Sequence, residues 1–185
     1  MDTIRVTLIE DHDLTRMGLR TILEVEKEIK VVGEARNGMS GLQLLYSTQP
    51  DIAIVDVGLP EMNGIELTQT FKNSLDAESS IQTKILIMTM NHSEDTVLAA
   101  FAAGADSYFM KDSDIDRFVE AVKITHSGNS WIDPSIARII LEKSTKNLSA
   151  QNNYLDTVEI HGLSLEENQL LNLYPLTSRE LEVLN

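Results

Sequence analysis

Short apolar runs alternate with longer segments whose apolar residues repeat at helical spacing, five times in succession from the amino terminus. The apolar runs lie at 5–9, 29–35, 51–55, 84–88 and 107–110. The third run is continuously apolar from Ile52 to Val55 and is followed by glycine and proline, which is typical of a strand covered on both faces. This alternation predicts an α/β fold over residues 1–128: a doubly wound, five-stranded parallel sheet with the flavodoxin-like order 2-1-3-4-5.

The helical segments are predicted to face the sheet with apolar residues spaced three and four apart. These residues are Leu19, Ile22 and Leu23; Met39, Leu42, Leu45 and Tyr46; Val97, Leu98 and Phe101; and Ile115, Phe118, Val119 and Val122. Met88, Met90 and Met110 are expected to fill the core or its margin. The run at 29–35 is mixed in polarity, which favours a strand at the side of the sheet.

The pattern changes after residue 128. Asp133 and Pro134 suit the N-cap and the first residue of a further helix, whereas residues 146–154 are rich in Asn, Ser and Gln. Two later pairs have the spacing of a capping box, Ser164 with Glu167 and Thr177 with Glu180. We therefore expect a helix and linker over 129–174 and the opening helix of a second, truncated domain over 175–185.

Composition narrows the possible functions. The chain has 185 residues, of which 42% are hydrophobic, and it contains no cysteine, which excludes disulfides and thiolate metal sites. The net charge of −14 repels phosphate backbones, so this chain is not expected to bind DNA by itself. The amino terminus has no leader or membrane segment, which predicts a cytoplasmic protein without a membrane partner.

Chemically suitable side chains follow four of the predicted strands. Asp56 ends the central strand, Glu10 and Asp11 follow the first strand, and Thr89 and Lys111 follow the fourth and fifth. Carboxyl ends of parallel strands meet at one end of a sheet, where α/β proteins gather their ligands. We therefore expect these five residues to lie together.

Carboxylates crowded in this way are costly unless a cation joins them. Magnesium prefers oxygen ligands, and the expected set is Glu10, Asp11, Asp56 and the backbone carbonyl of Gly58. With the ion bound, Asp56 would stay ionised and could take a phosphoryl group as an acyl phosphate. Lys111 and Thr89 would then cover the transferred oxygens.

Each residue taken alone also has a simpler structural interpretation. Glu10 and Asp11 could cap the first helix, Thr89 could be an ordinary strand residue, and Lys111 a solvated strand end. His12, beside the acids, is expected to start the helix and not to bind metal. Five suitable residues at the ends of four strands favour the functional interpretation of the set.

The motif DVGLPEMNG around Asp56 and the segment GADSYFMKD around Lys111 resemble the response-regulator receiver domains of two-component signalling. The resemblance implies that Glu10 and Asp11 are the magnesium-holding acids, Asp56 the phosphoacceptor, Thr89 the conformational hydroxyl, Tyr108 the rotating aromatic residue and Lys111 the invariant basic residue. The Lys-Asp pair at 111–112, the helix after residue 133 and PLTSRELEVL at 175–184 resemble the NarL/FixJ subgroup, whose output is a LuxR-type helix-turn-helix. We expect the given sequence to include only the opening helix of that output domain.

Two positions and one connection depart from the common receiver pattern. Gly58 stands two residues after the acceptor, where a side chain is usual, and Met90 is bulkier than the residue usual after the hydroxyl position. We expect Gly58 and Asn91 to set the lifetime of the phosphoryl group and Met90 to narrow access to it. The third departure is the long connection between the third helix and the fourth strand.

The resemblance implies that a sensor histidine kinase, or a small phosphodonor, phosphorylates Asp56 and that phosphorylation promotes a homodimer. DNA would be bound only through the largely missing output domain, in the service of transcription regulation. The chain is not expected to be an enzyme beyond its own phosphorylation and slow dephosphorylation. Two alternatives stay open here, an aspartyl-nucleophile phosphatase, which would need an acid where Gly58 stands, and a receiver-like interaction module that is never phosphorylated.

Overall fold

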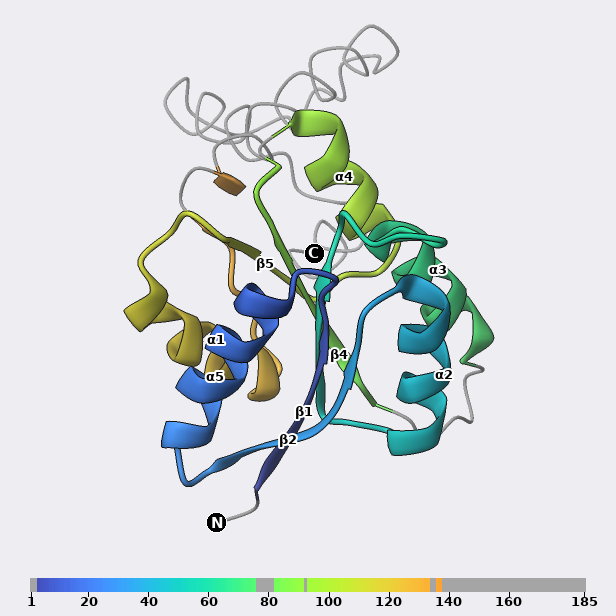
Figure 1. Cartoon of the computed structure of the whole chain (residues 1–185). Helices are drawn as coiled ribbons and strands as arrows, with labels where there is room; N and C mark the ends of the chain where they lie inside the picture. Colours follow the sequence, from blue (N-terminus) through green and yellow to red (C-terminus); the bar gives the residue numbers. More distant parts are fainter. Residues whose placement is uncertain (1–2, 76–81, 92, 134–135, 138–185) are drawn as a thin grey trace, which may run out of the picture. The chain divides into compact units, whose positions relative to one another are not determined.

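The computed structural model describes residues 3–75, 82–91, 93–133 and 136–137. In these residues one five-stranded sheet has the order β2-β1-β3-β4-β5 (Figure 1). The strands are β1 at Ile4–Ile9, β2 at Ile29–Ala35, β3 at Ile52–Asp56, β4 at Lys84–Thr89 and β5 at Ser107–Met110. Every neighbouring pair is parallel, so the predicted flavodoxin-like sheet is confirmed, with the mixed-polarity strand β2 at one side.

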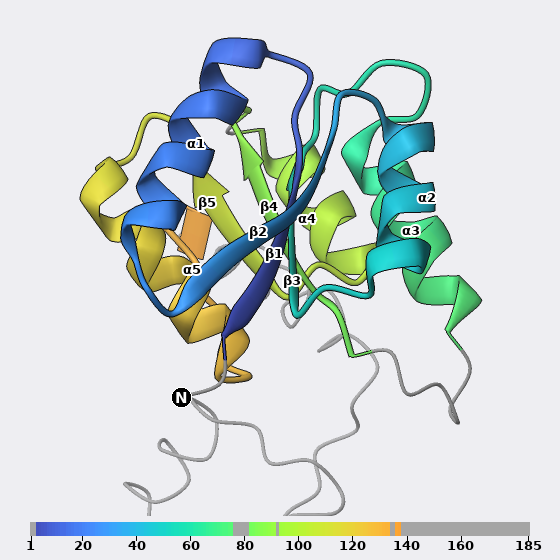
Figure 2. The same ribbon diagram turned by 60° about the horizontal axis from the view of Figure 1, so that its bottom comes forward.

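Helices cover both faces of the sheet (Figure 2). They are α1 at Asp13–Val25, α2 at Gly38–Thr48, α3 at Gly64–Ser74, α4 at Glu94–Ala102 and α5 at Phe118–His126, the last preceded by a 3₁₀ turn, η1, at Ile115–Arg117. One apolar core lies between the sheet and α1 and α5, and a second lies between the sheet and α2, α3 and α4. All five residues of β3 are buried between these cores, as the continuous apolar run predicts.

The inner face of α2 differs from the prediction. Met39 is 46% exposed and Tyr46 40% exposed, whereas Gly38, Gly41 and Leu45 are buried. A Cβ at Gly41 would lie 2.6 Å from the side chain of Ile9, so this helix packs too closely against β1 for a side chain there. A hydropathy pattern counts only apolar side chains and therefore misses a face formed by glycine.

Two further expectations about the core were wrong. Met90 is 60% exposed, although Met88 and Met110 are buried as predicted. Ile115 belongs to the 3₁₀ turn and is 39% exposed, so the inner face of α5 begins only at Phe118. In both cases the residue lies just beyond a strand or helix, where the pattern of that element no longer decides burial.

The chain after Gly128 continues along the outer side of β5. The amide of Tyr108 donates to the carbonyl of Trp131 at 2.8 Å, and Ile132 forms a parallel bridge with Tyr108. Ile136 and Ala137 are helical, and their amides donate to the carbonyl of Asp133, as a helix starting at Asp133 requires. The domain limits at 128 and 174 remain predictions.

The linker at 146–154, both capping boxes and the helix expected at 175–185 lie outside the described residues. Within the part that the structure describes, no helix has the length and apolar character needed to cross a membrane.

Candidate functional site

The carboxyl end of the sheet, where β1, β3, β4 and β5 finish, brings the predicted acids together. Carboxylate oxygens of Glu10, Asp11 and Asp56 lie within 4.8 Å of one another. Glu10 and Asp56 are buried, and Asp11 is exposed. Since the strands are parallel, the residues that follow them converge, and here they form a group of oxygen donors suited to a hard cation.

Lys111 lies between two of these acids. Its Nζ is 2.6 Å from Glu10 Oε2 and 3.0 Å from Asp56 Oδ2. Burial alone would lower the pKa of Lys111, but the hydrogen bond to Glu10 and the charge of Asp56 outweigh it, so the pKa lies above its ordinary value. The ammonium is therefore charged at neutral pH and placed to neutralise negative oxygens.

Glu10 is the most deeply buried of the three acids. Glu10 is 3% exposed, and this burial raises the pKa of its carboxyl. The hydrogen bond to Lys111 lowers the pKa but does not outweigh the effect of burial. The amide of His12 donates to Glu10 Oε1 at 3.1 Å. His12 itself occupies the N-cap position of α1, so it starts the helix as predicted.

Thr89 and Tyr108 are joined through one residue of the loop after β4. The amide of Asn91 donates to Thr89 Oγ1 at 3.1 Å, and the hydroxyl of Tyr108 donates to the carbonyl of Asn91 at 3.0 Å. Tyr108 is fully buried, which, together with the charge of Asp56, raises the pKa of its hydroxyl to about 12. The hydroxyl is therefore a neutral donor at any physiological pH.

Residues 6–123 match the response regulator receiver domain family. The chain belongs to this family. The transcriptional regulatory protein LnrK of Bacillus subtilis is 32% identical over 183 residues, which cover 98% of this chain and 75% of that protein. The transcriptional regulatory protein DegU of Brevibacillus brevis is 28% identical over 181 residues, which cover 98% of this chain and 73% of that protein.

Solved structures agree with this assignment. A LuxR-family two-component response regulator from Aurantimonas sp. SI85-9A1 is similar, with a TM-score of 0.71, 33% identity and coverage of 78% of this chain and 99% of that one. The response regulator ChrA has a TM-score of 0.62 and 30% identity, with coverage of 99% of this chain and 81% of that one. The chain therefore carries a receiver domain of the NarL/LuxR type, which implies phosphorylation and a role in transcription regulation. The phosphatase and the unphosphorylated interaction module find no support.

A hollow of about 530 Å³ opens over the acids of this receiver. Its lining includes Glu10, Asp56, Lys111 and the exposed Met90. Gly58 is exposed, and a Cβ added to it would lie 3.5 Å from Asp56 Oδ2, in ordinary contact. A side chain at 58 would thus contact the carboxylate of Asp56, and glycine makes no such contact.

Both the backbone and the side chain of Asn91 form hydrogen bonds. In addition to the two backbone contacts above, its side-chain oxygen accepts from the amide of Ser93 at 2.8 Å. This carboxamide oxygen helps to form the turn before α4, and control of the phosphoryl lifetime by Gly58 and Asn91 remains a prediction.

Arg16 supports the receiver's acid pair and was not predicted. Its guanidinium is almost fully buried and donates to the carbonyl of Glu10 at 2.8 Å, to Glu34 at 3.1 Å and to Asp13. Arg16 thereby fixes the turn between β1 and α1 and occupies two acids that do not belong to the metal-binding group. The signal was present in the sequence, because Arg16 falls three residues before Leu19, on the apolar side of α1.

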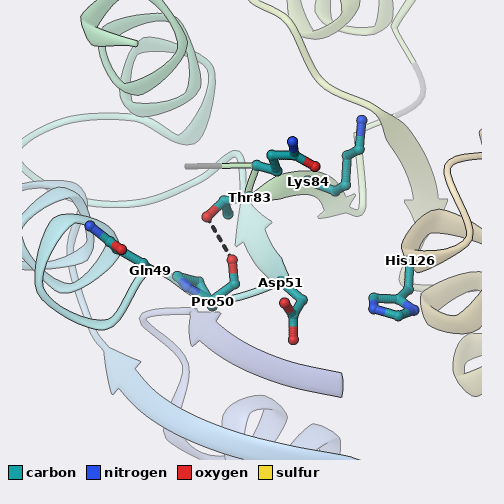
Figure 3. A pocket seen from close by; sticks show the side chains of 7 residues that line it. Gln49, Pro50, Asp51, Thr83, Lys84 and His126 are labelled. Carbon is teal, nitrogen blue, oxygen red and sulfur yellow. Dashed lines mark hydrogen bonds between the residues drawn. The ribbon is translucent and has the colours of Figure 1, made fainter. Parts of the chain in front are cut away.

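The amino end of the receiver's sheet carries a second, smaller hollow of about 310 Å³ (Figure 3). Gln49, Pro50, Asp51, Thr83, Lys84 and His126 are among the residues that line it. The hydroxyl of Thr83 donates to the carbonyl of Pro50 at 2.6 Å and the amide of Arg5 donates to Asp51 at 2.7 Å. These contacts hold the starts of neighbouring strands together.

Proposed function

We propose that Asp56 accepts the phosphoryl group of this receiver. The observation that carries the proposal is the position of Asp56 at the buried end of β3, with its carboxylate 3.0 Å from Lys111 Nζ and grouped with Glu10 and Asp11. Asp56 also lines the hollow through which a donor would enter.

The transfer forms a bond between an Asp56 carboxylate oxygen and phosphorus and breaks the bond between phosphorus and the donor. For a phosphohistidine donor the leaving group is the imidazole, which takes its electron pair with it. Lys111 donates to the transferred oxygens, and the Thr89 hydroxyl is the second donor assigned to them. Asp56 needs no general base because a carboxylate is already a nucleophile.

Glu10, Asp11 and Asp56 would hold a magnesium ion, with the carbonyl of Gly58 as a further ligand. The donor set fits, because all side-chain donors are carboxylate oxygens, they lie within 4.8 Å of one another, and the chain has no cysteine to favour a softer metal. When bound, magnesium supplies positive charge that offsets the crowded carboxylates and the incoming phosphoryl oxygens.

The donor we propose is the phosphohistidine of a sensor histidine kinase. Three apolar side chains, Leu14, Met90 and Ile115, line the hollow and are exposed, Leu14 by 74%. Exposed apolar side chains beside a charged site suit a protein surface that docks and then leaves. A small phosphodonor would use the same acceptor without this rim.

For the response, we propose that charge on Asp56 acts on Thr89 and Tyr108 and changes the surface formed by α4, β5 and α5. A second copy of the chain would pair on phosphorylation, and DNA would be reached only through the output region that begins near residue 175. Met90, at the mouth of the hollow, would restrict access to the acyl phosphate.

The test is mass spectrometry after incubation with acetyl phosphate and magnesium. The wild-type chain should gain one phosphoryl group that is lost in acid or hydroxylamine, and Asp56→Asn should gain none. Asp51→Asn is the matched control, since Asp51 immediately precedes the other end of β3 and this variant should label normally. Labelling of Asp56→Asn at the wild-type rate would refute the assignment.

A further inference from the structure

The residues after α5 form an additional, strand-like edge of the sheet, which we call the strap and define as Trp131, Ile132, Asp133 and Ile136. Its amide and carbonyl groups pair with Tyr108 of β5 on both sides: Tyr108 N donates to Trp131 O at 2.8 Å, and Asp133 N donates to Tyr108 O at 3.4 Å. The amide of Trp131 also donates to Ser107 Oγ at 2.9 Å. The strap therefore closes the side of the sheet that β5 would otherwise expose.

The side chains of the strap enter both cores. Trp131 packs with Phe109 and Phe118 on the α1 and α5 side, and the guanidinium of Arg117 lies 4.9 Å from the centre of its ring. Ile132 and the fully buried Ile136 belong to the other core, which also holds Tyr108. Part of the packing around Tyr108 thus comes from the segment that leads toward the output region.

A second connection joins the strap to Lys111. The hydroxyl of Ser113 donates to the carboxylate of Asp133. Ser113 N in turn donates to Met110 O at 3.0 Å, which closes a four-residue turn with Lys111 inside it. Lys111 and the contact to Asp133 therefore lie on one short, hydrogen-bonded turn.

Both connections start from groups that respond to charge on Asp56. Lys111 Nζ contacts Asp56 and Glu10, so a phosphoryl group on Asp56 must change its set of partners. Tyr108 is bonded through Asn91 to Thr89, the hydroxyl assigned to the transferred oxygens. The backbone of Tyr108 then pairs directly with the strap.

We propose that the strap is the element through which this chain transmits the phosphorylation state of Asp56 to the residues beyond 137, and that the hydrogen bond from Ser113 to Asp133 is the coupling contact. The proposal rests on the proposed function, because it requires an acyl phosphate on Asp56. Ser113 and Asp133 act here as positioning residues that work through Lys111 and the strap.

Trp131 makes the proposal measurable, because it is the only tryptophan in the chain. Its emission is recorded in the full chain before and after acetyl phosphate with magnesium, and mass spectrometry measures the phosphorylated fraction in the same samples. We expect the wild-type chain to shift its emission in proportion to that fraction. Ser113→Ala should reach the same fraction at saturating donor, with the emission shift reduced by about twofold or more.

Two further variants separate coupling from general damage. Ser113→Thr keeps the hydroxyl and should restore the wild-type shift. Ser47→Ala is the matched control, since the hydroxyl of Ser47 donates within its own helix to Leu44 O, and it should behave as wild type.

The outcomes are distinguishable. A phosphorylated wild-type chain with unchanged emission, or an unreduced shift in Ser113→Ala, would overturn the role of the strap and leave Asp56 as acceptor. Absence of any mass gain would overturn the proposed function and the strap's role with it.

Discussion

The two ends of the sheet carry the same kinds of charged residue, but their charges are balanced differently. At the amino end, Asp106 accepts from Lys72 at 2.8 Å, from Lys84 at 3.3 Å and from the amide of Ile85 at 2.8 Å. At the carboxyl end, one lysine, Lys111, bridges Glu10 and Asp56, with Asp11 beside them. At the amino end the carboxylate of Asp106 has a complete set of partners. At the carboxyl end three carboxylates are grouped with one lysine, which leaves an excess of negative charge that a cation can neutralise.

This difference in charge balance distinguishes the amino end, whose ion pairs hold the strands together, from the carboxyl end, where the reactive site lies. Buried polar groups with complete sets of partners stabilise a fold, whereas crowded like charges destabilise it until a bound cation offsets their repulsion. The hollow at the amino end is lined by residues that hold strand starts together, so we interpret it as structural (Figure 3). Substitutions of the same kind should have opposite consequences at the two ends.

Replacing one lysine at each end gives the largest expected contrast. Lys111→Met removes the charge beside Asp56 and should slow phosphorylation by about 100-fold, the usual cost of losing one donor to developing negative oxygens. Lys84→Met should leave the rate unchanged, because Lys84 pairs with Asp106 at the opposite end of the sheet. The rate of mass gain with acetyl phosphate measures phosphorylation in both variants. Equal slowing in the two would refute the proposed difference between the two ends of the sheet.

The reverse contrast appears in stability. Asp106→Ala leaves the amide of the fully buried Ile85 without its acceptor and separates two lysines from their partner, so unfolding should become easier by about 2 kcal/mol. Asp106→Asn keeps an acceptor oxygen and should cost less. Urea unfolding measures the loss, and phosphorylation should continue normally in the folded variant. A loss below about 0.5 kcal/mol would show that the amino end is not a structural closure.

A stabilising substitution is expected only at the carboxyl end. Burial raises the pKa of Glu10 above its ordinary value of 4.5, so its charged form is unfavourable in the folded chain. Glu10→Gln should therefore stabilise the metal-free protein by about 1 kcal/mol at neutral pH, while weakening magnesium binding. Asp51→Asn, at the amino end, should not stabilise, because Asp51 accepts from the amide of Arg5.

The pH dependence of this gain has a defined sign. Since the folded state holds a proton on Glu10 more tightly than the unfolded state, the raised pKa makes wild-type stability fall as the pH rises from about 4.5 through that pKa. The advantage of Glu10→Gln should thus shrink as the pH falls through the raised pKa and be lost below about pH 4.5. Urea unfolding in the presence of a chelator measures it, and an advantage that grows toward acid pH would contradict the account.

The sequence predicts the carboxyl end better than the amino end for a physical reason. Parallel strands must finish together, so the order of apolar runs along the chain is enough to group the residues that follow them. Pairs such as Arg5 with Asp51, or Lys72 with Asp106, depend on how distant segments meet, which no local pattern records. The convergence of the acids therefore follows from the alternation of strands and helices together with the expected flavodoxin-like order, whereas the ion pairs of the amino end do not.

Close approach and solvent exposure set the other limits. Gly41 forms part of the inner face of α2 because β1 leaves no room for a Cβ, and an apolar pattern cannot register a missing side chain. Met90 is apolar but lies beyond the last residue of β4, so it faces the hollow and not the core. Trp131 falls in the segment predicted as helix and linker. Its packing with Phe109 and Phe118 depends on contacts between different segments of the chain, which hydrophobic periodicity within one segment does not record.

The smallest expected effect concerns how long the carboxyl end holds its phosphoryl group. A Cβ at Gly58 would lie 3.5 Å from Asp56 Oδ2, so Gly58→Ala should exclude water from one side of the acyl phosphate and slow its hydrolysis by about two- to fivefold. Gly18→Ala is the control, since Gly18 lines the hollow over the acids and a Cβ there meets nothing within 4 Å. Loss of the phosphorylated mass after removal of the donor gives both rates. If both variants hydrolyse at the wild-type rate, open access at Gly58 does not set the lifetime, and water must reach the acyl phosphate from the side of Met90.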